Sequence, residues 1–196
     1  MDLRTDGTLP LDEQIAALTV DIPDHPEPGV LFRDLTPVFA DGPAFRRVVE
    51  GLAAPADSDP RAAAVGGDDS DRPPFDVVVG VEARGFLLAA AVAHAAGVGV
   101  VLVRKAGKLP RERIAADYSL EYGTATLELH SDALKPGQRV LVVDDVLATG
   151  GTLAATVALV EQLGAVVTAV SVVVELTELG GRQRLAPHAV HALWTT

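Results

Sequence analysis

The sequence predicts an α/β fold with an open, mainly parallel twisted sheet flanked by helices. Several segments are apolar throughout, as expected of buried strands, and they include DVVVGV (76–81), RVLVV (139–143) and AVVTAVSVVVEL (165–176). Helical segments of about a dozen residues alternate with these strands. Strands without a polar face, joined by helices, occur in parallel sheets that are covered on both sides. At 196 residues, the chain has room for one domain with one substantial core.

The segment that precedes the first buried strand is patterned less regularly. Apolar residues between positions 11 and 18 recur at helical spacing behind Pro10, which predicts a short helix. A Pro-rich stretch follows at residues 21–29, and a second helix is predicted over residues 44–52. Residues 53–74 are rich in Asp, Pro, Gly and Ala, so we expect an exposed, mobile acidic insertion there.

Helices and strands alternate in the rest of the chain. GFLLAAAVAHAAG (85–97) is predicted to be a helix that is apolar on all sides, and its last residue, Gly97, suits a C-terminal cap. A strand is predicted at residues 98–103, and a half-exposed strand at 124–129. The spacing of apolar residues then predicts a helix from residue 153 to about 164.

Composition excludes several classes of protein. No apolar run is long enough to span a membrane, and the N-terminus lacks the apolar segment of a signal peptide, so we expect a cytoplasmic protein. The absence of cysteine excludes disulfides and thiolate chemistry. A net charge of -11 disfavours a protein that holds nucleic acid, although a small phosphorylated substrate needs only a local basic site such as RKAGKLPRER (104–113).

VLVVDDVLATGGT (140–152) is the motif that carries chemistry. Its loop ATGGT leads into a helix, and free backbone N–H groups, two hydroxyls and close approach at glycine suit a phosphate dianion. Asp144 and Asp145 would repel that phosphate and favour vicinal hydroxyls or a metal. A hydroxyl that donates to a charged acceptor contributes about 1.5–3 kcal/mol, so ribose 5-phosphate satisfies both halves. Taken singly, a helix cap at Thr149 and a polar strand end are the structural alternatives.

Two other nucleotide-binding motifs are excluded. Gly80 and Gly85 have the spacing of a P-loop, but Phe86 and Leu87 stand where that loop requires Lys followed by Ser or Thr. No GxGxxG sequence follows a predicted strand, so the fingerprint of a dinucleotide-binding fold is missing as well.

The chain resembles the type I phosphoribosyltransferases, and within that family it is similar to the members that act on adenine. Residues 140–152 are similar to the family's phosphoribosyl-diphosphate signature. The further matching segments are PGVLFRDLTPVF (28–39), VVGVEARGFLLAAAVA (78–93), VLVRKAGKLPRE (101–112), YSLEYGTATLELH (118–130) and VVELTELGGRQRL (173–185). The resemblance implies a single domain over residues 1–196, with a small N-terminal hood over about 1–40 and a flexible lid over about 104–122.

The resemblance implies a reaction and a set of roles. Adenine displaces pyrophosphate from 5-phosphoribosyl diphosphate and gives AMP, a step of purine salvage. Mg²⁺ is expected as the cofactor, bound mainly through the pyrophosphate and without a side-chain metal site. A homodimer is expected, in which Arg104 reaches the neighbouring subunit's site. The residues expected to bind phosphoribosyl diphosphate are Asp144, Asp145, Ala148, Thr149, Gly150, Gly151, Thr152, Glu82, Ala83, Arg84, Gly85, Arg104, Lys105, Lys108 and Tyr122.

The base and its proton have their own expected residues. Phe32 and Leu176 are expected to sandwich adenine, while the backbone of Leu31 and the side chain of Arg33 contact its edge. Glu121 is expected to be catalytic and to handle the N7 proton of the base when the lid closes.

Structural alternatives stand beside these roles. The residues from 107 to 121 also suit a solvated basic loop, and Phe32, Leu176 and Tyr122 suit a core. Arg33 could pair locally with the residue that follows it. The sequence departs from the family pattern at His25, Glu27 and Ala106, in the acidic insertion and at its C-terminal end.

Two alternative functions compete with that of a transferase. A protein of this fold that senses phosphoribosyl diphosphate and regulates transcription is disfavoured, because neither a DNA-binding segment nor a basic face is visible. An enzyme that uses hypoxanthine, guanine or xanthine is disfavoured by the residues at the base edge.

Overall fold

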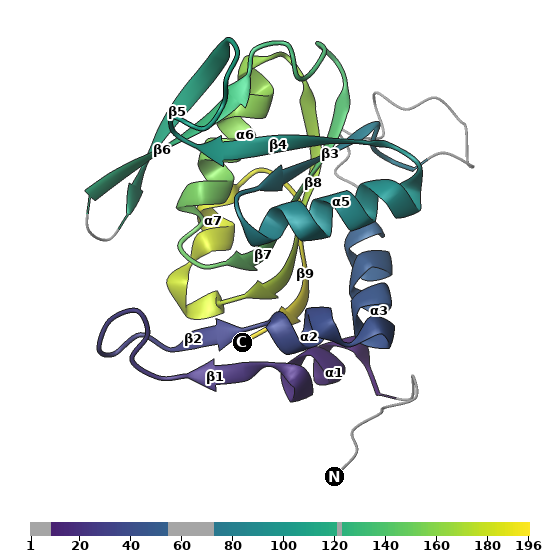
Figure 1. Cartoon of the computed structure of the whole chain (residues 1–196), viewed down its shortest axis with the longest axis vertical. Helices are drawn as coiled ribbons and strands as arrows, with labels where there is room; N and C mark the ends of the chain where they lie inside the picture. Colours follow the sequence, from purple (N-terminus) through teal and green to yellow (C-terminus); the bar gives the residue numbers. More distant parts are fainter. Residues whose placement is uncertain (1–8, 55–72, 121–122) are drawn as a thin grey trace.

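The structure is a computed structural model that describes residues 9–54, 73–120 and 123–196. Its main sheet consists of β3 (Val77–Val81), β4 (Gly99–Lys105), β5 (Arg113–Leu120), β6 (Gly123–His130), β7 (Arg139–Leu147), β8 (Val166–Glu175) and β9 (Val190–Thr195). The strand order is β5-β6-β4-β3-β7-β8-β9 (Figure 1). The neighbours from β4 to β9 pair in parallel, whereas β6 pairs antiparallel with both β4 and β5. The predicted open, mainly parallel sheet is confirmed.

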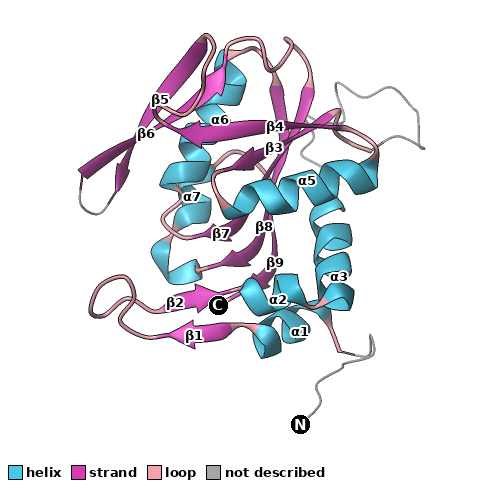
Figure 2. Ribbon diagram, viewed as in Figure 1, coloured by secondary structure: helices cyan, strands magenta, loops and turns pink. Residues whose placement is uncertain are grey.

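Helices cover both faces of this sheet (Figure 2). The helices on one face are α1 (Leu11–Leu18), α3 (Gly42–Ala53) and α5 (Arg84–Ala96), and α6 (Gly151–Gln162) lies on the other. Side chains along β3 alternate between the two cores: Val78 packs with α3 and α5, whereas Val77 and Val79 pack with α6. Strands with two buried faces explain the unbroken apolar runs in the sequence.

The chain reverses its winding direction at β3, whose two neighbours are β4 and β7. Pairing between β3 and β7 ends at Gly80 and Val143, but β7 continues along β8 until Leu147 lies beside Glu175. The predicted strand at 139–143 is therefore too short, because β8 supplies hydrogen-bond partners beyond the end of β3. In parallel α/β sheets, ligands bind at such a switch point, outside the carboxyl ends of the strands.

A second, two-stranded sheet lies beside the end of β9 (Figure 1). It consists of β1 (Val20–Ile22) and β2 (Phe32–Asp34), which pair antiparallel, and α2 (Thr36–Ala40) follows it. These elements were not predicted. The residues of the two strands are exposed or half-buried, so they show no apolar alternation that would mark a strand.

The segment predicted to be a flexible lid contains the strand β5. β5 pairs with β6 along its whole length, from Arg113 beside His130 to Leu120 beside Gly123. The alternative of a solvated basic loop from 107 to 121 is wrong for residues 113–120, which form β5. Of the predicted insertion at 53–74, residues 55–72 lie outside the described part of the chain.

The C-terminal elements complete the fold. η1 (Thr177–Leu179) and α7 (Gly181–Leu185) connect β8 to β9, and neither they nor β9 were predicted. The predicted cap of α5 is confirmed, since Gly97 has the left-handed conformation with φ of 67°. Among the described helices, none is both long and apolar enough to cross a lipid bilayer.

Candidate active site

Two adjacent carboxylates lie at the carboxyl end of the central strand β7. Asp144 and Asp145 are 9% and 6% exposed, and the backbone N–H of Asp145 donates to Asp144 Oδ1 at 2.9 Å. Burial raises the pKa of Asp144 well above its ordinary value of 3.8, and the neighbouring charge of Asp145 raises it further. Asp144 is thus a carboxyl that the fold keeps close to the protein interior at a cost in stability.

Arg84 connects these carboxylates to the small β1–β2 sheet. Its Nε lies 2.8 Å from Asp145 Oδ2, and its guanidinium carbon lies 5.3 Å from the centre of the Phe32 ring. Arg84 is the first residue of α5, directly after the strand β3, so its side chain starts at the same edge of the main sheet as the carboxylates. Phe32, Arg84 and Asp145 belong to three different elements and are up to 113 positions apart in sequence, but they meet at one place.

Glycine makes close packing possible between the start of α5 and the two central strands. A Cβ at Gly85 would lie 2.8 Å from Asp144 Oδ1 and 3.0 Å from the carbonyl oxygen of Val143. A Cβ at Gly80, on β3, would lie 2.6 Å from Ala89 Cβ and 2.9 Å from the carbonyl oxygen of Gly85. The first turn of α5 therefore packs directly against β3 and β7, and this close contact fixes Arg84 relative to the carboxylates.

Glu82 contacts the basic residues at the end of β4 and in the loop that follows it. Its Oε1 accepts from Lys108 Nζ at 2.6 Å, and its Oε2 accepts from the backbone N–H of Lys105 at 3.0 Å. Arg104 Nε lies 3.4 Å from the same Oε2. Burial alone would raise the pKa of Glu82, but the hydrogen bonds and charges of Lys108, Lys105 and Arg104 outweigh it and lower that pKa. All four residues were predicted to bind phosphoribosyl diphosphate, and the structure brings them together. Ala83, predicted for the same ligand, lies between Glu82 and the start of α5.

The glycine-rich loop between β7 and α6 has the expected form. Gly150 is buried and has φ of 78°, and α6 begins at Gly151. Thr149 is exposed, whereas Ala148 and Thr152 are half-buried. The first N–H groups of a helix have no intrahelical acceptor, so this loop presents donors and the positive end of a helix dipole beside the Asp144–Asp145 pair.

The residues predicted to contact adenine lie close to the end of β8. Leu176 is half-buried, and its N–H donates to the carbonyl oxygen of Leu147 at 2.9 Å. Phe32 is half-buried and meets the ring of His25 edge-on, with 5.0 Å between ring centres, while Leu31 is 47% exposed.

The side chain of Arg33 is occupied by contacts within the protein. Its Nη1 donates to Asp21 Oδ1 at 3.0 Å, its Nη2 donates to Thr196 Oγ1 at 2.9 Å, and its guanidinium lies 5.0 Å from the centre of the Trp194 ring. These contacts hold β2 against the end of β9. A direct contact from this guanidinium to a bound base would require one of them to be exchanged.

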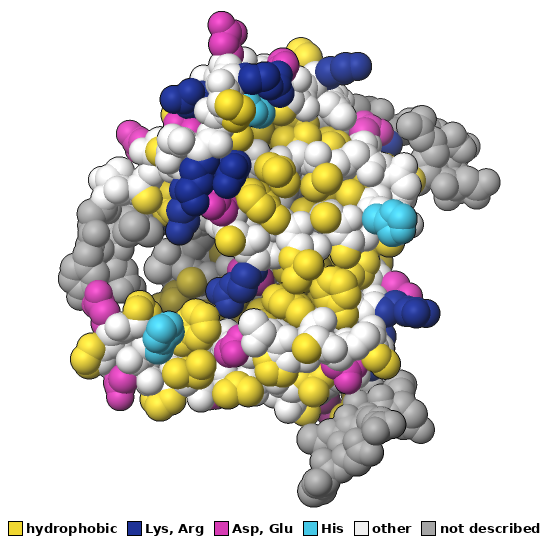
Figure 3. Space-filling view, viewed as in Figure 1, with side chains coloured by type: hydrophobic (Ala, Val, Ile, Leu, Met, Phe, Trp, Pro, Cys, Tyr) yellow, Lys and Arg dark blue, Asp and Glu magenta, His cyan; other side chains and the backbone are white. Residues whose placement is uncertain are grey.

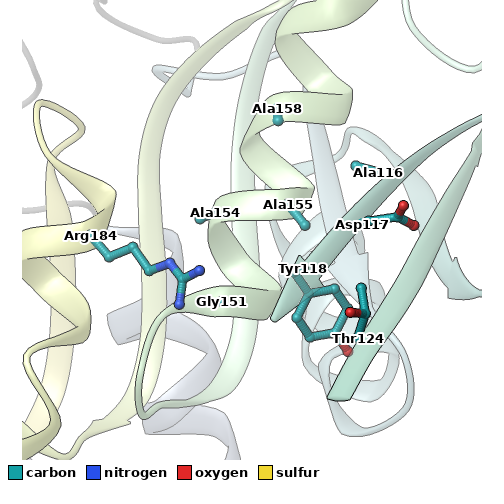
Figure 4. A pocket seen from close by; sticks show the side chains of 9 residues that line it. All are labelled: Ala116, Asp117, Tyr118, Thr124, Gly151, Ala154, Ala155, Ala158 and Arg184. Atoms are coloured by element: carbon teal, nitrogen blue, oxygen red, sulfur yellow. The ribbon is translucent and has the colours of Figure 1, made fainter. Parts of the chain in front are cut away.

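A pocket of about 320 Å³ lies outside this cluster, between the β5–β6 hairpin and the outer face of α6 (Figure 4). Its lining residues are Ala116, Asp117, Tyr118, Thr124, Gly151, Ala154, Ala155, Ala158 and Arg184. Among the candidate site residues that the structure describes, it includes Gly151 alone. The convergence of charged side chains at the ends of β3 and β7 therefore defines the site better than cavity size does. Glu121 and Tyr122 lie outside the described residues.

Sequence reasoning missed Gly181, which contacts the loop between β7 and α6. A Cβ on Gly181 would collide with the carbonyl oxygen of Ala148 and lie 3.0 Å from the backbone nitrogen of Gly150. The signal in the sequence is the Gly180–Gly181 pair, which marks a close backbone approach but does not identify the partner.

Comparison with known proteins identifies the family. The model of the phosphoribosyl transferase domain matches residues 40–188. An adenine phosphoribosyltransferase from Salinispora arenicola is 56% identical over 194 residues, which cover 99% of this chain and 96% of the relative. One from Renibacterium salmoninarum is 56% identical over 183 residues, covering 93% and 92% of the two chains.

Solved structures agree with the sequence relatives. The crystal structure of adenine phosphoribosyltransferase from Thermoanaerobacter pseudethanolicus has a TM-score of 0.80 and 43% identity, and the match covers 94% of this chain and 99% of that one. The enzyme from Saccharomyces cerevisiae, complexed with adenine and an imino-altritol bisphosphate, has a TM-score of 0.81 and 36% identity over 93% and 98% of the chains. The chain belongs to the phosphoribosyltransferase family and, within it, to the adenine phosphoribosyltransferases.

Proposed function

We propose that this chain catalyses a step of purine salvage in which the 5-phosphoribosyl group of 5-phosphoribosyl diphosphate is transferred to adenine, giving AMP and pyrophosphate. The observation that carries the proposal is the position of the Asp144–Asp145 pair, directly before a glycine-rich loop that opens α6. Paired acceptors beside an anion-binding helix end match a ribose diol that carries a phosphate.

The phosphoribosyl group is held by β7 and the loop that follows. Asp144 and Asp145 accept hydrogen bonds from the two ribose hydroxyls, and residues 148–152 donate backbone N–H groups and the Thr149 and Thr152 hydroxyls to the 5-phosphate. When the bond between C1 and the pyrophosphate oxygen breaks, its electron pair leaves with pyrophosphate and positive charge develops on the sugar. Carboxylates that lie near the ring favour that charge.

Pyrophosphate is assigned to the loop from Glu82 to Gly85 together with Arg104, Lys105 and Lys108. A bound polyanion competes with Glu82 for Lys108, whose side chain is 48% exposed. Among the described residues, no group of three or more His, Asp or Glu is arranged to hold a metal ion, so Mg²⁺ would be carried by the diphosphate oxygens. When bound, it would neutralise charge on the leaving group.

Adenine is assigned to the space between the β1–β2 sheet and the end of β8. Phe32 and Leu176 offer apolar faces to the ring, and the exposed backbone at Leu31 suits its hydrogen-bonding edge. Arg33 keeps its hydrogen bonds to Asp21 and Thr196, and it contributes to base binding by holding β2 in place. N9 of adenine bonds to C1 as pyrophosphate departs.

The β5–β6 hairpin is proposed to serve as the lid. It carries Glu121 and Tyr122 between its two strands, and Glu121 is proposed to take the proton that adenine loses. Tyr122 is proposed to contact the phosphoribosyl group. Exclusion of water by the closed hairpin protects the sugar cation from hydrolysis.

Incubation of the purified protein with Mg²⁺, phosphoribosyl diphosphate and each purine base in turn tests the function. We expect AMP from adenine, detected by liquid chromatography, and a rate at least 10²-fold lower with hypoxanthine, guanine or xanthine, since a hydrogen-bonding site rejects a base with the wrong edge. Equal product from hypoxanthine would overturn the assignment of the base, and the absence of any nucleotide would overturn the transferase.

We also propose a homodimer formed through the face of α5 and β4. Leu87 on α5 is 51% exposed, and Val100 and Leu102 on β4 are 42% and 41% exposed. Figure 3 shows hydrophobic side chains gathered over these two elements. β4 also carries Arg104, so a partner on this face would bring that arginine to the subunit boundary.

Leu102→Glu tests the dimer, with Leu179→Glu as the matched control, since Leu179 is 42% exposed but lies on η1. Light scattering coupled to size-exclusion chromatography should show a dimer for the unmodified chain and the control, and a monomer for Leu102→Glu. A monomer in all three samples would refute the proposal.

A further inference from the structure

The phosphate loop rests on the start of α7. A Cβ at Gly150 would lie 2.7 Å from the carbonyl oxygen of Gly181, and a Cβ at Gly181 would collide with the carbonyl oxygen of Ala148. A Cβ at Gly181 would also lie 2.7 Å from Leu147 Cδ1. The backbones of the two segments are thus in direct contact, without room for a methyl group between them, so any shift of α7 is transmitted to the loop.

One arginine holds this short helix in place. Arg182 Nε donates to Glu175 Oε1 at 2.9 Å and lies 3.2 Å from Oε2, and Arg182 Nη2 makes a second contact with Oε2. Arg182 Nη1 donates to the carbonyl oxygen of Val190 at 2.7 Å. A helix of five residues has too few internal hydrogen bonds to fix its own position, and the forked guanidinium ties it to both β8 and β9.

The acceptor of this ion pair adjoins the base site. Glu175 is 4% exposed, is the last residue of β8 and lies beside Leu147 of β7. The next residue is Leu176, and the residue after Leu147 is Ala148, the first of the phosphate loop. The Arg182–Glu175 pair therefore lies between the residue proposed to contact adenine and the loop proposed to bind the 5-phosphate.

We propose that Arg182 and Glu175 are positioning residues for the transfer reaction, which hold the phosphate loop through Gly181 and fix its place relative to Leu176. The proposal rests on the assignment of residues 148–152 to the 5-phosphate. Arg182 contacts no substrate in this scheme. Loss of the ion pair lets α7 shift, and the loop and the base contact then lose their alignment while the pyrophosphate loop at 82–85 is unaffected.

Arg182→Gln tests the proposal, with Arg139→Gln as the matched control. Arg139 makes an equivalent pair with Asp76, with 2.7 Å between Nη2 and Oδ1, but it lies at the opposite end of β7. Both variants are expected to unfold at a lower temperature. Calorimetry should show that Arg182→Gln weakens ribose 5-phosphate binding by roughly 10- to 100-fold and raises KM for phosphoribosyl diphosphate. Pyrophosphate affinity should stay within about twofold of the unmodified value.

Arg139→Gln should leave ribose 5-phosphate affinity unchanged, and Arg182→Lys should restore part of the affinity that Arg182→Gln loses. If all of the proteins bound ribose 5-phosphate with equal affinity, measured well below their unfolding temperatures, the Arg182–Glu175 pair would have only a structural role and the proposal would be overturned. If Arg182→Gln does not fold, Gly181→Ala provides the test, because it displaces the loop with the ion pair intact, and undiminished phosphate affinity in it would overturn the proposal. Failure of the unmodified protein to bind ribose 5-phosphate would instead refute the phosphate assignment itself.

Discussion

A single methyl group at Gly85 should disturb both halves of the phosphoribosyl site. The added Cβ would lie 2.8 Å from Asp144 Oδ1, about 0.6 Å closer than the 3.4 Å at which ordinary contact begins. It would also lie 3.0 Å from the carbonyl oxygen of Val143, in the middle of the sheet. Neither neighbour is the flexible end of a long side chain. Either the Asp144 carboxylate or the first turn of α5, with Arg84, must therefore move by several tenths of an ångström.

The expected magnitudes follow from this overlap. Overpacking of a tight site costs about 1–3 kcal/mol of unfolding free energy, which for a chain of this size lowers Tm by roughly 2–12 °C. A displaced carboxylate or guanidinium should lower kcat/KM for phosphoribosyl diphosphate by roughly 10- to 100-fold. Initial rates of AMP formation and a calorimetric melting curve measure the two effects.

Gly42→Ala is the matched control for Gly85→Ala. Gly42 is likewise in the first turn of a helix, but an added Cβ there meets nothing within 4 Å. We expect unchanged kinetics and no loss of Tm, since alanine restricts the unfolded chain more than glycine does. If Gly85→Ala matched Gly42→Ala in both measurements, the close packing of α5 against β3 and β7 would not be what positions the site.

Three further changes test other parts of the site. Asp144→Asn together with Asp145→Asn should weaken binding of phosphoribosyl diphosphate by at least 10-fold in calorimetry, because two charged acceptors of ribose hydroxyls are lost, and unchanged affinity would refute the ribose assignment. Because the pKa of Asp144 is raised in the folded protein, its stabilising contribution is complete below the unfolded pKa of 3.8 and is lost as the pH rises through the folded pKa. The Tm of Asp144→Asn relative to the unmodified protein should therefore increase between pH 4 and 8. A difference in Tm that does not depend on pH would contradict this. Glu121→Gln should lower kcat by roughly 10²-fold or more with little change in adenine affinity, and equal losses in both would exclude proton transfer as its role.

The parts of the fold that the sequence predicts are those buried on two faces. Val77 to Val81 are apolar without interruption, because the side chains on both sides of β3 contact a core, and so they stand out from their neighbours. β5 was missed because it is an edge strand with one neighbour, and its charged residues at 113 and 117 interrupt any apolar alternation. β5 is a strand because it pairs with β6, and its own residues do not reveal that pairing.

The site was predictable as a set of residues but not as an arrangement. The two aspartates and the glycine-rich loop could be identified from the sequence, because a purely structural role rarely requires these residues one after the other. Arg33 shows the limit, because its partners Asp21 and Thr196 come from both ends of the chain. The contact between Gly181 and Ala148 likewise depends on how η1 and α7 return toward β7 after β8 ends.

The adjacency of β3 and β7 separates two tasks that an enzyme of this kind performs. Main-chain hydrogen bonds keep neighbouring strands about 4.8 Å apart, and this repeat sets the span between the leaving-group loop and the acidic pair. On the proposed assignments, most contacts to the base come from elsewhere, from the two-stranded β1–β2 sheet, which pairs with no strand of the main sheet, and Leu176 after β8 supplies the remaining one. The spacing of the strands thus fixes the geometry of bond breaking, so we expect changes within residues 20–34 and at Leu176 to alter the choice of base without altering the sugar chemistry.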